Sequence, residues 1–448
     1  MSLPWLVKKF LDERSYHYVL SAPGQSPSQD HAALRLQVIY LEDSLGSLQV
    51  LLPVTHMLRL SSLAEDFGRN FTVMSRAHSL RMFARLGIAQ PSGVLPLADL
   101  HTLIDHSVLG HSHYLIDSGD SDSLLCIDEQ ALLRLIADSE GEIVHLCSDT
   151  RPVPASCDDE ADILRSVQSL TSLRIRQRLD ETIEIPPLPE TARQILKLRS
   201  DPEARVEELA RIIERDPALD AQVICWASSP FYGPAGVHSV DDAIMRVLGF
   251  DMVLNMALGL SLGRSLDLPQ DGPGGLLLYW EQAAQTAQGM LELIKIMPRH
   301  LRVHSSKAYL CGLLHNFGVL ISAHLFPGHY SLVCRHIEAN PHLPVSVIER
   351  QLLGVTRDQL SAWLLQNWNM SAEVVGALRY QNCPRLAEPH AFLPRLLQLT
   401  RALLEGRPVT DELITDLPLE REAAQTCIGQ MLSDIGPELH TLARKMSA

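Results

Sequence analysis

Clustered basic charge is what this sequence most clearly lacks. Its 38 lysines and arginines are outnumbered by 53 aspartates and glutamates, which gives a formal net charge of −15 at pH 7. General binding to nucleic acid requires lysines and arginines in clusters that neutralise phosphates, so this charge argues against it. The same balance favours a soluble protein whose partners are other proteins or small molecules.

Spanning apolar segments and paired cysteines are also missing. Without an uninterrupted apolar run of about 20 residues, no membrane-crossing helix is predicted. The N-terminal segment MSLPWLVKKFLDERSYHYVL carries charges within its apolar pattern and no small-residue cleavage site, which predicts an amphipathic helix and not an export signal. We therefore expect a cytoplasmic protein with no membrane partner. The cysteines form no CxxC pair and predict neither a zinc knuckle nor a disulfide framework; they stand at positions 126, 147, 157, 225, 311, 334, 383 and 427.

The length of 448 residues is enough for two sizeable cores. Short β-rich runs alternate with segments of helical periodicity at the start, which predicts a mixed α/β domain over residues 1–148. A stretch rich in serine, proline and aspartate then indicates a linker, followed by an amphipathic connecting helix, over residues 149–180. The expected strands are residues 36–43, 47–54 and 113–117, and the expected helices are residues 58–67 and 75–86.

Helical periodicity dominates residues 181–448, which predicts an all-helical domain with a core at about 185–384 and a C-terminal helical extension. Capping residues mark several helix starts. Asp216, followed by proline, is typical of a helix N-terminus. Thr356 and Gln359 form a capping-box pattern before an apolar helix. The predicted fold class is multidomain, α/β plus all-α.

The segment GLLHNFG at residues 312–318 places a histidine beside an asparagine on a predicted helix. Adjacent histidine and aspartate would give a divalent ion one imidazole and one bridging carboxylate, which is the start of a hydrolytic site. Asn316 offers only a neutral amide oxygen and cannot supply the negative charge that holds a hard or borderline cation. The motif therefore indicates the frame of a hydrolase without its metal.

Several segments occur in an order that carries a family resemblance: IPPLPETARQILKL, VEELARIIERDPALDAQVICWASSPFYG, SVDDAIMRVLGFDMVLNMAL, the pair YW at 279–280, and GLLHNFGVL. On these segments the second half resembles the HDOD family, a bacterial relative of the HD phosphohydrolases in which the metal chemistry is commonly lost. The resemblance implies a compact bundle of helices only. That expectation agrees with the periodicity of this half.

The resemblance also implies where a metal site would lie. Active relatives place histidines at the positions that are Gln282 and Arg357 here, and a closing pair of histidines at Gln381 and Asn382. His315 is the one retained member of the implied ligand set, and the positive charge of Arg357 would oppose a cation. We expect no metal and no cofactor. The resemblance implies a vestigial cavity formed by Gln282, His315, Asn316, Arg357, Gln381 and Asn382.

A second resemblance covers about residues 5–138. The segments LVKKFLDERSYHYVL, LQVIYLED, LQVLLPV, LGIAQPSGVLPL and LIDHSVL look similar, in that order, to the YbaK/ProX family of aminoacyl-tRNA editing domains. In the family, a lysine just before the first long strand supports deacylation. Arg35 is the nearest match here and keeps the charge without the compact ammonium geometry. The resemblance implies Arg35, Gly93 and Pro96 as pocket candidates.

Both halves thus resemble enzyme-derived frames that lack key charged groups. We expect no catalytic residues and a non-enzymatic bacterial signal-transduction or regulatory protein, whose HDOD bundle is a protein-interaction or ligand-responsive scaffold for an unidentified regulatory protein partner. One alternative is a nucleotide sensor, in which Arg357 pairs with phosphate in the vestigial cavity. The enzymatic alternatives are residual aminoacyl-tRNA deacylase activity in the N-terminal domain and HD phosphohydrolase activity in the helical one.

Overall fold

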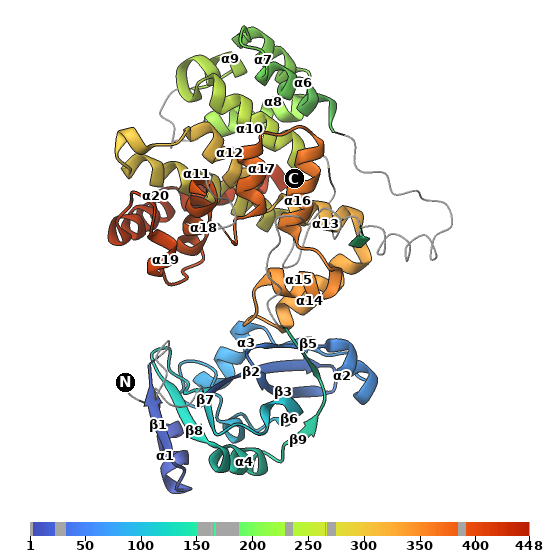
Figure 1. The fold of residues 1–448 in the computed structure, drawn as a ribbon, viewed down its shortest axis with the longest axis vertical. Helices are drawn as coiled ribbons and strands as arrows, with labels where there is room; N and C mark the ends of the chain where they lie inside the picture. The colour runs from blue at the N-terminus through green and yellow to red at the C-terminus, as the bar shows by residue number, and fades with distance from the viewer. Residues whose placement is uncertain are drawn as a thin grey trace, which may run out of the picture. The chain divides into compact units, whose positions relative to one another are not determined.

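The chain divides into two compact units (Figure 1). The first contains Met1–Val153 together with Leu332–Leu352, and the second contains Pro154–Ser331 with Leu353–Ala448. A mixed α/β region precedes a helical one, as the sequence predicts. The linker and connecting helix predicted over 149–180 lie almost entirely outside the described residues. The computed structural model describes residues 3–22, 33–150, 163, 165–166, 188–228, 236–264, 266, 275–383 and 391–447.

A sheet of eight strands forms the base of the first unit. Its order is β1-β8-β7-β2-β3-β6-β9, and β5 pairs with β2 beside this path. The short strands β4 and β10 pair with each other. The strands are β1 (Tyr18–Ser21), β2 (Leu34–Asp43), β3 (Gly46–Pro53), β4 (His56–Leu58), β5 (Thr72–Val73), β6 (His101–Asp105), β7 (His113–Asp117), β8 (Leu124–Asp128), β9 (Glu142–Val144) and β10 (Cys147–Asp149).

The long hairpin of β2 and β3 sets the register of the sheet. The two strands are antiparallel, with Leu36 opposite Pro53 and Asp43 opposite Gly46. Asp43 fixes the turn because its Oδ1 accepts hydrogen bonds from the backbone N–H of Leu45 at 2.9 Å and of Gly46 at 3.1 Å. Strand β2 also pairs in parallel with β7, and β3 in parallel with β6. The three strands predicted from the sequence are confirmed as β2, β3 and β7.

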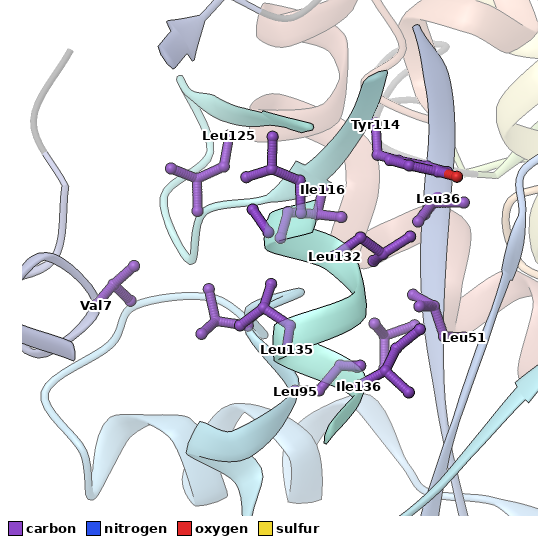
Figure 2. Close-up of a cluster of buried hydrophobic side chains, with 14 of the residues drawn as sticks. Val7, Leu36, Leu51, Leu95, Tyr114, Ile116, Leu125, Leu132, Leu135 and Ile136 are labelled. Atoms are coloured by element: carbon purple, nitrogen blue, oxygen red, sulfur yellow. The ribbon is translucent and has the colours of Figure 1, made fainter. Parts of the chain in front are cut away.

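Helix α4 closes the main core of this sheet. Figure 2 shows its side chains Leu132, Leu135 and Ile136 lying among strand side chains such as Leu36 and Leu51, all of them buried. The apolar residues repeat along α4 at helical spacing, so one stripe faces the sheet. The amphipathic first helix and both other predicted helices are confirmed. The helices are α1 (Trp5–Glu13), α2 (Leu60–Phe67), α3 (Arg76–Ala84) and α4 (Glu129–Asp138), with 3-10 turns η1 (Leu95–Ala98) and η2 (His106–Val108).

A helical segment from the second half of the sequence, Leu332–Leu352, packs within the first unit. Asn340 in this segment is fully buried, and its side chain binds both backbone groups of Leu58 in β4. The Leu58 N–H donates to Asn340 Oδ1 at 2.7 Å, and Asn340 Nδ2 donates to the Leu58 carbonyl at 3.2 Å. His342 Nε2 lies 2.9 Å from the carbonyl oxygen of His56. The inserted segment therefore binds β4 as a neighbouring strand would.

Replacing Asn340 by alanine is expected to loosen β4. The Asn340→Ala variant leaves a buried N–H and a buried C=O of Leu58 without partners, which costs about 2 kcal/mol or more. We expect amide hydrogen exchange in β4 and β10 to accelerate by about tenfold or more, since each 1.4 kcal/mol is a factor of ten. Asn367→Ala is the matched control, because Asn367 Nδ2 donates to the Trp363 carbonyl in the second unit. Equal exchange in the two variants would contradict the anchoring role of Asn340.

The second unit consists of helices in the part that the structure describes. Helices α12, α18 and α20 all contact α11 (Figure 1). A Cβ at Gly312 in α12 would lie 2.5 Å from the Cα of Ala287 in α11, so only glycine permits this close approach. Its helices are α6 (Glu190–Arg199), α7 (Val206–Glu214), α8 (Pro217–Ala227), α9 (Val240–Asp242), η4 (Ala243–Leu248), α10 (Phe250–Gly263), α11 (Leu276–Ile296), η5 (Arg299–Leu301), α12 (Ser305–Leu314), α13 (Phe317–Leu325), α16 (Arg357–Asn367), α17 (Ala372–Arg379), α18 (Phe392–Leu404), α19 (Asp411–Ile414) and α20 (Arg421–Ser447). Helices α14 (Pro327–Ala339) and α15 (Val345–Leu353) carry the segment Leu332–Leu352, which belongs to the first unit.

Two of the predicted helix starts are confirmed. Asp216 caps α8, where its Oδ1 accepts hydrogen bonds from the backbone N–H of Ala218 and Leu219. Thr356 caps α16 in a reciprocal capping box with Gln359, in which the Gln359 N–H donates to Thr356 Oγ1 and the Thr356 N–H donates to Gln359 Oε1. This box fixes the first turn of α16, which carries two residues of the candidate site.

One stretch, Ser305–Leu325, is long and apolar enough to cross a membrane by length and composition. The sequence pattern predicts no such segment. Of its most apolar window, 94% is buried inside the structure, as expected for a core helix of a globular unit. The stretch comprises α12 and α13, which contact α11 and α16 respectively.

Candidate functional site

His315 and Asn316 lie at a break between two helices. The sequence predicts one helix that runs through both residues, and this prediction is wrong. Helix α12 ends at Leu314, and α13 begins at Phe317. His315 Nδ1 lies 2.7 Å from the Gly312 carbonyl oxygen, so the ring takes an acceptor that the backbone of a continuing helix would use. The break turns the two polar side chains into the interior, where His315 is 7% and Asn316 is 6% exposed.

Burial is the main influence on the charge state of His315. Burial first, and then the positive charges of Arg401 and Arg357, lower the pKa of His315 to about 3, while the hydrogen bond to Gly312 acts in the opposite direction. The imidazole is therefore neutral at pH 7. Since Nδ1 carries the proton that it donates to Gly312, Nε2 is the ring nitrogen with the lone pair.

Asn316 is held by one end of its amide. Its Nδ2 donates to the carbonyl oxygen of Tyr279 in α11 at 3.0 Å. Its Oδ1 is buried and has no hydrogen-bond partner among the residues that the structure describes. A carboxylate at this position would lack the donor that binds Tyr279, so the amide suits this backbone and an acid does not.

A buried carboxylate, Asp358, organises the rest of the cluster. It lies in the first turn of α16 and is 7% exposed. Gln381 Nε2 donates to Asp358 Oδ1 at 2.8 Å, and Asn382 Nδ2 donates to Asp358 Oδ2 at 2.5 Å. Gln381 Nε2 also lies 2.9 Å from the carbonyl oxygen of His315, and its Oε1 accepts from Arg401 Nη1 at 3.0 Å. The two amides thus stabilise the packing of the cluster by donating to the buried carboxylate.

The structure brings most of the predicted cavity residues together, but not all. The buried cluster contains His315, Asn316 and Gln381, with Asn382 at its exposed rim. Arg357 is half-buried at the start of α16, and its charge acts on His315. Gln282 is exposed on α11 and stands apart from these hydrogen bonds. Only the family resemblance pointed to Gln282. On α11 this residue lies between the buried residues Tyr279 and Ala283, and helix periodicity turns its own side chain to the exposed face.

Asp358 and Arg401 were missed from the sequence. Asp358 had a weak signal, because it lies inside the Thr356–Gln359 capping box, where an acidic residue reads as an ordinary first-turn charge. Arg401 had none, since it lies on α18, 20 positions after Gln381, with no motif around it. Side chains that meet only through helix packing leave no local pattern.

Gly318 allows α13 to pack against the start of α16. A Cβ at Gly318 would lie 2.0 Å from the carbonyl oxygen of Arg357, which is a backbone atom that cannot move alone. We expect Gly318→Ala to destabilise the second unit by about 1–3 kcal/mol through overpacking. Gly376→Ala on α17 is the matched control, because a Cβ there meets nothing within 4 Å and the change should be neutral or stabilising. Urea unfolding followed by hydrogen exchange in α13 measures the stability of both variants. Equal stability of the two variants would refute the packing role.

The donor set of the cluster does not suit the metal site that an HD phosphohydrolase would hold. It offers one imidazole and one carboxylate, and both oxygens of that carboxylate already accept hydrogen bonds from the two amides. No group of three or more His, Cys, Asp or Glu side chains converges for metal binding in the described part of the chain. Two guanidinium groups act on the same point and oppose a cation. We therefore derive no metal-dependent step from this cluster.

Two of the three pocket candidates of the first unit, Arg35 and Gly93, contact a residue that was not predicted, Asp117 at the end of β7. Arg35 Nη2 lies 3.7 Å from Asp117 Oδ1, and the arginine side chain is 46% exposed. The Gly93 N–H donates to the Asp117 carbonyl at 2.7 Å, and a Cβ at Gly93 would lie 2.8 Å from the Cβ of Ile116. Burial raises the pKa of Asp117, and Arg35 lowers it. Pro96 lies three positions beyond Gly93, in η1.

Comparison with known proteins identifies the helical half. The model of the HDOD domain family matches residues 185–384. A protein from Marinobacter aquaeolei VT8, provisionally described as a signal transduction protein, is 37% identical, and its crystal structure matches with a TM-score of 0.87 over 100% of both chains.

More distant relatives share part of the chain. An uncharacterized protein of Treponema pallidum (strain Nichols) is 25% identical over 226 residues, which are 50% of this chain and 43% of that protein. This chain therefore spans less than half the length of that relative. A protein of Shewanella amazonensis SB2B, provisionally described as a phosphohydrolase, is 20% identical with a TM-score of 0.49 over 64% of this chain and 98% of that one. The likeness of the first unit to YbaK/ProX domains stays a prediction.

Proposed function

We propose, from the premise that this chain belongs to the HDOD family, that its second unit is a non-enzymatic regulatory scaffold of bacterial signal transduction. The description of the Marinobacter relative, which matches over its whole length, supports a regulatory role. The finer elements of the proposal are a cytoplasmic location and a protein partner. They rest on the acidic charge balance of the chain.

The observation that carries the proposal is the positive field at His315. The charges of Arg401 and Arg357 both act on His315, the one imidazole of the cluster, and both lower its pKa. The two guanidinium groups would repel a metal cation at His315 for the same reason that they disfavour a second proton on its imidazole. Hydrolysis of a phosphoester by this cluster would need an activated water, and it has no metal-binding donor set to lower the pKa of one.

The hydrogen bonds of the cluster support a structural role for the replaced residues. Gln381 joins the end of α17 to α16 through Asp358, to the α12–α13 break through His315, and to α18 through Arg401. A side chain that links four elements stabilises one arrangement of them. We therefore propose that the former catalytic position now maintains the shape of a binding surface.

The decisive experiment measures complementation in the host and the metal content of the purified protein. In His315→Asn, the asparagine Nδ2 replaces Nδ1 as donor to Gly312, while the lone retained imidazole is removed. A scaffold predicts that this variant complements a deletion in the native host as fully as the wild-type chain, at equal protein level. Elemental analysis of chain purified without chelator should find no stoichiometric transition metal. Loss of complementation by a folded variant, or a bound metal with phosphohydrolase turnover, would overturn the proposal.

A nucleotide sensor at the same cluster is the second candidate, favoured by the two guanidinium groups near His315. Calorimetry with a panel of nucleotides tests it on the full chain. Binding that weakens at least tenfold in both Arg357→Ala and Arg401→Ala would support the assignment. Binding that neither change affects would place the nucleotide elsewhere.

For the first unit we propose a binding or purely structural role in place of tRNA editing. Arg35 stands where the editing family has a lysine, and its guanidinium lies near Asp117, which weakens its attraction for a substrate. Incubation with mischarged tRNA tests this directly. Deacylation by the wild-type chain that disappears in Arg35→Ala would revive the enzymatic alternative.

A further inference from the structure

A cavity of about 750 Å³ lies within the second unit among α8, α11 and α20. This volume falls in the range of small-molecule sites in proteins. The cavity is not the cluster around His315. Helix α20 follows the part of the chain that the HDOD model matches, residues 185–384, so the cavity depends on the C-terminal extension.

The cavity walls are mainly aliphatic. Ile224 of α8 and Ile435, Leu439 and Leu442 of α20 line it, with Trp226 at one side. Burying an aliphatic body against such walls contributes roughly 25 cal/mol for each Å² removed from water. The walls therefore favour a ligand with an apolar chain over a sugar, a nucleotide or a free phosphate.

The charged side chains that line the cavity differ in whether a neighbouring group already stabilises their charge. Asp220 lies in the first turn of α8, where the positive end of the helix stabilises a carboxylate. Glu438 already has an interaction partner. Lys445 contacts the Cys225 thiol, with Nζ 3.5 Å from Sγ, and makes no ion pair with any residue that the structure describes. The ammonium group of Lys445 is thus the charge that a ligand can still pair with.

We infer that this cavity binds an amphipathic carboxylate with an aliphatic body, whose carboxylate pairs with Lys445 while the chain lies between α8 and α20. The inference does not depend on the scaffold role of the second unit. A medium-chain carboxylate satisfies both observations, the aliphatic walls and the single uncompensated ammonium group. Gln288 on α11 lines the same cavity, and its Nε2 already donates to Glu292 Oε1 at 2.8 Å.

Calorimetry of the full chain with decanoate, decanol and decylamine tests the inference, below the concentrations at which these molecules form micelles. They share one body and differ at the end group. We expect decanoate to bind about threefold to fivefold more tightly than decanol, because Lys445 is exposed and an exposed ion pair is worth up to about 1 kcal/mol, and decylamine to bind most weakly. Lys445→Met should reduce decanoate binding to the level of decanol. Lys197→Met, an exposed lysine on α6 outside the cavity, should change nothing.

A second variant fills the cavity without disturbing the core. Ala221 is exposed on α8 and lines the cavity, so Ala221→Trp places an indole in it, and circular dichroism verifies that the variant is folded. We expect it to abolish binding of decanoate and decanol alike. Binding that survives Ala221→Trp would place the ligand outside this cavity. Equal affinity for decanoate and decanol, no change in Lys445→Met, or no binding of any probe would each overturn the inference.

Discussion

Acidification from pH 7.5 to pH 5 is expected to lower the stability of the second unit by about 2 kcal/mol through His315 alone. The unfolded histidine has a pKa of 6.5, whereas burial and two nearby arginines lower the pKa of folded His315 to about 3. As the pH falls below 6.5, the unfolded chain binds a proton that the folded chain rejects. The stabilisation is therefore complete above pH 6.5, declines as the pH falls towards 3, and amounts to roughly 5 kcal/mol in total.

His315→Asn is the variant that isolates this effect. It keeps the donor to the Gly312 carbonyl and removes the titrating ring, so its stability should be lower at neutral pH but lack this component of the acid slope. The measurement is hydrogen exchange in α12 and α13 between pH 5 and pH 7.5, corrected for intrinsic exchange rates. The difference between wild type and variant removes the contribution of carboxylates such as Asp358.

The first unit provides the internal reference for this experiment. Burial also lowers the pKa of His336 and His342, so acid should loosen the packing around β4 in wild type and variant equally. Identical acid slopes of wild type and His315→Asn in α12 would show that His315 is not held neutral by its surroundings. The electrostatic basis of the proposed function would then be lost as well.

The sequence predicted those elements whose cause is local. The short β-rich runs of β2 and β3, the capping box of Thr356 and Gln359, and the Asp216 cap each arise from neighbouring residues, and all were found. The order of segments from residue 185 onward predicted the HDOD bundle, which the family model matches. The docking of Leu332–Leu352 in the first unit was not predicted, because Asn340 and His342 contact a strand that lies more than 280 positions away in the sequence.

The candidate site was predicted in the same partial way. The loss of aspartate at Asn316 is visible in the sequence, but the helix break at His315 is not, since it follows from a side chain competing for the Gly312 carbonyl. The sequence analysis interpreted Gln381 and Asn382 only as positions where the family resemblance implies histidines. Their role as donors to Asp358 depends on how α16 and α17 pack, which no local pattern records.

Restoring the missing acid by Asn316→Asp is expected to destabilise the second unit by several kcal/mol at pH 8 and not to restore a metal site. The carboxylate would lose the donor to the Tyr279 carbonyl and would sit where the present Oδ1 has no hydrogen-bond partner among the described residues. We expect burial to raise the pKa of the new carboxyl above that of an unfolded aspartate by more than the positive charges of Arg357 and Arg401 lower it. The cost therefore grows as the pH rises from about 4 and diminishes again on acidification, opposite in sign to the effect of His315.

Asn316→Ala is the matched control for this change. It also leaves the Tyr279 carbonyl without its donor, at about 1–3 kcal/mol, but it introduces no charge and should show no added dependence on pH. Thermal unfolding of both variants at pH 5 and pH 8, with and without Mn²⁺ or Zn²⁺, separates the two costs. If a metal ion stabilised Asn316→Asp at one ion per chain and left Asn316→Ala unchanged, the positive field of Arg357 and Arg401 would not exclude cations. The chain would then be one substitution from a metal site, and its scaffold role would need another explanation.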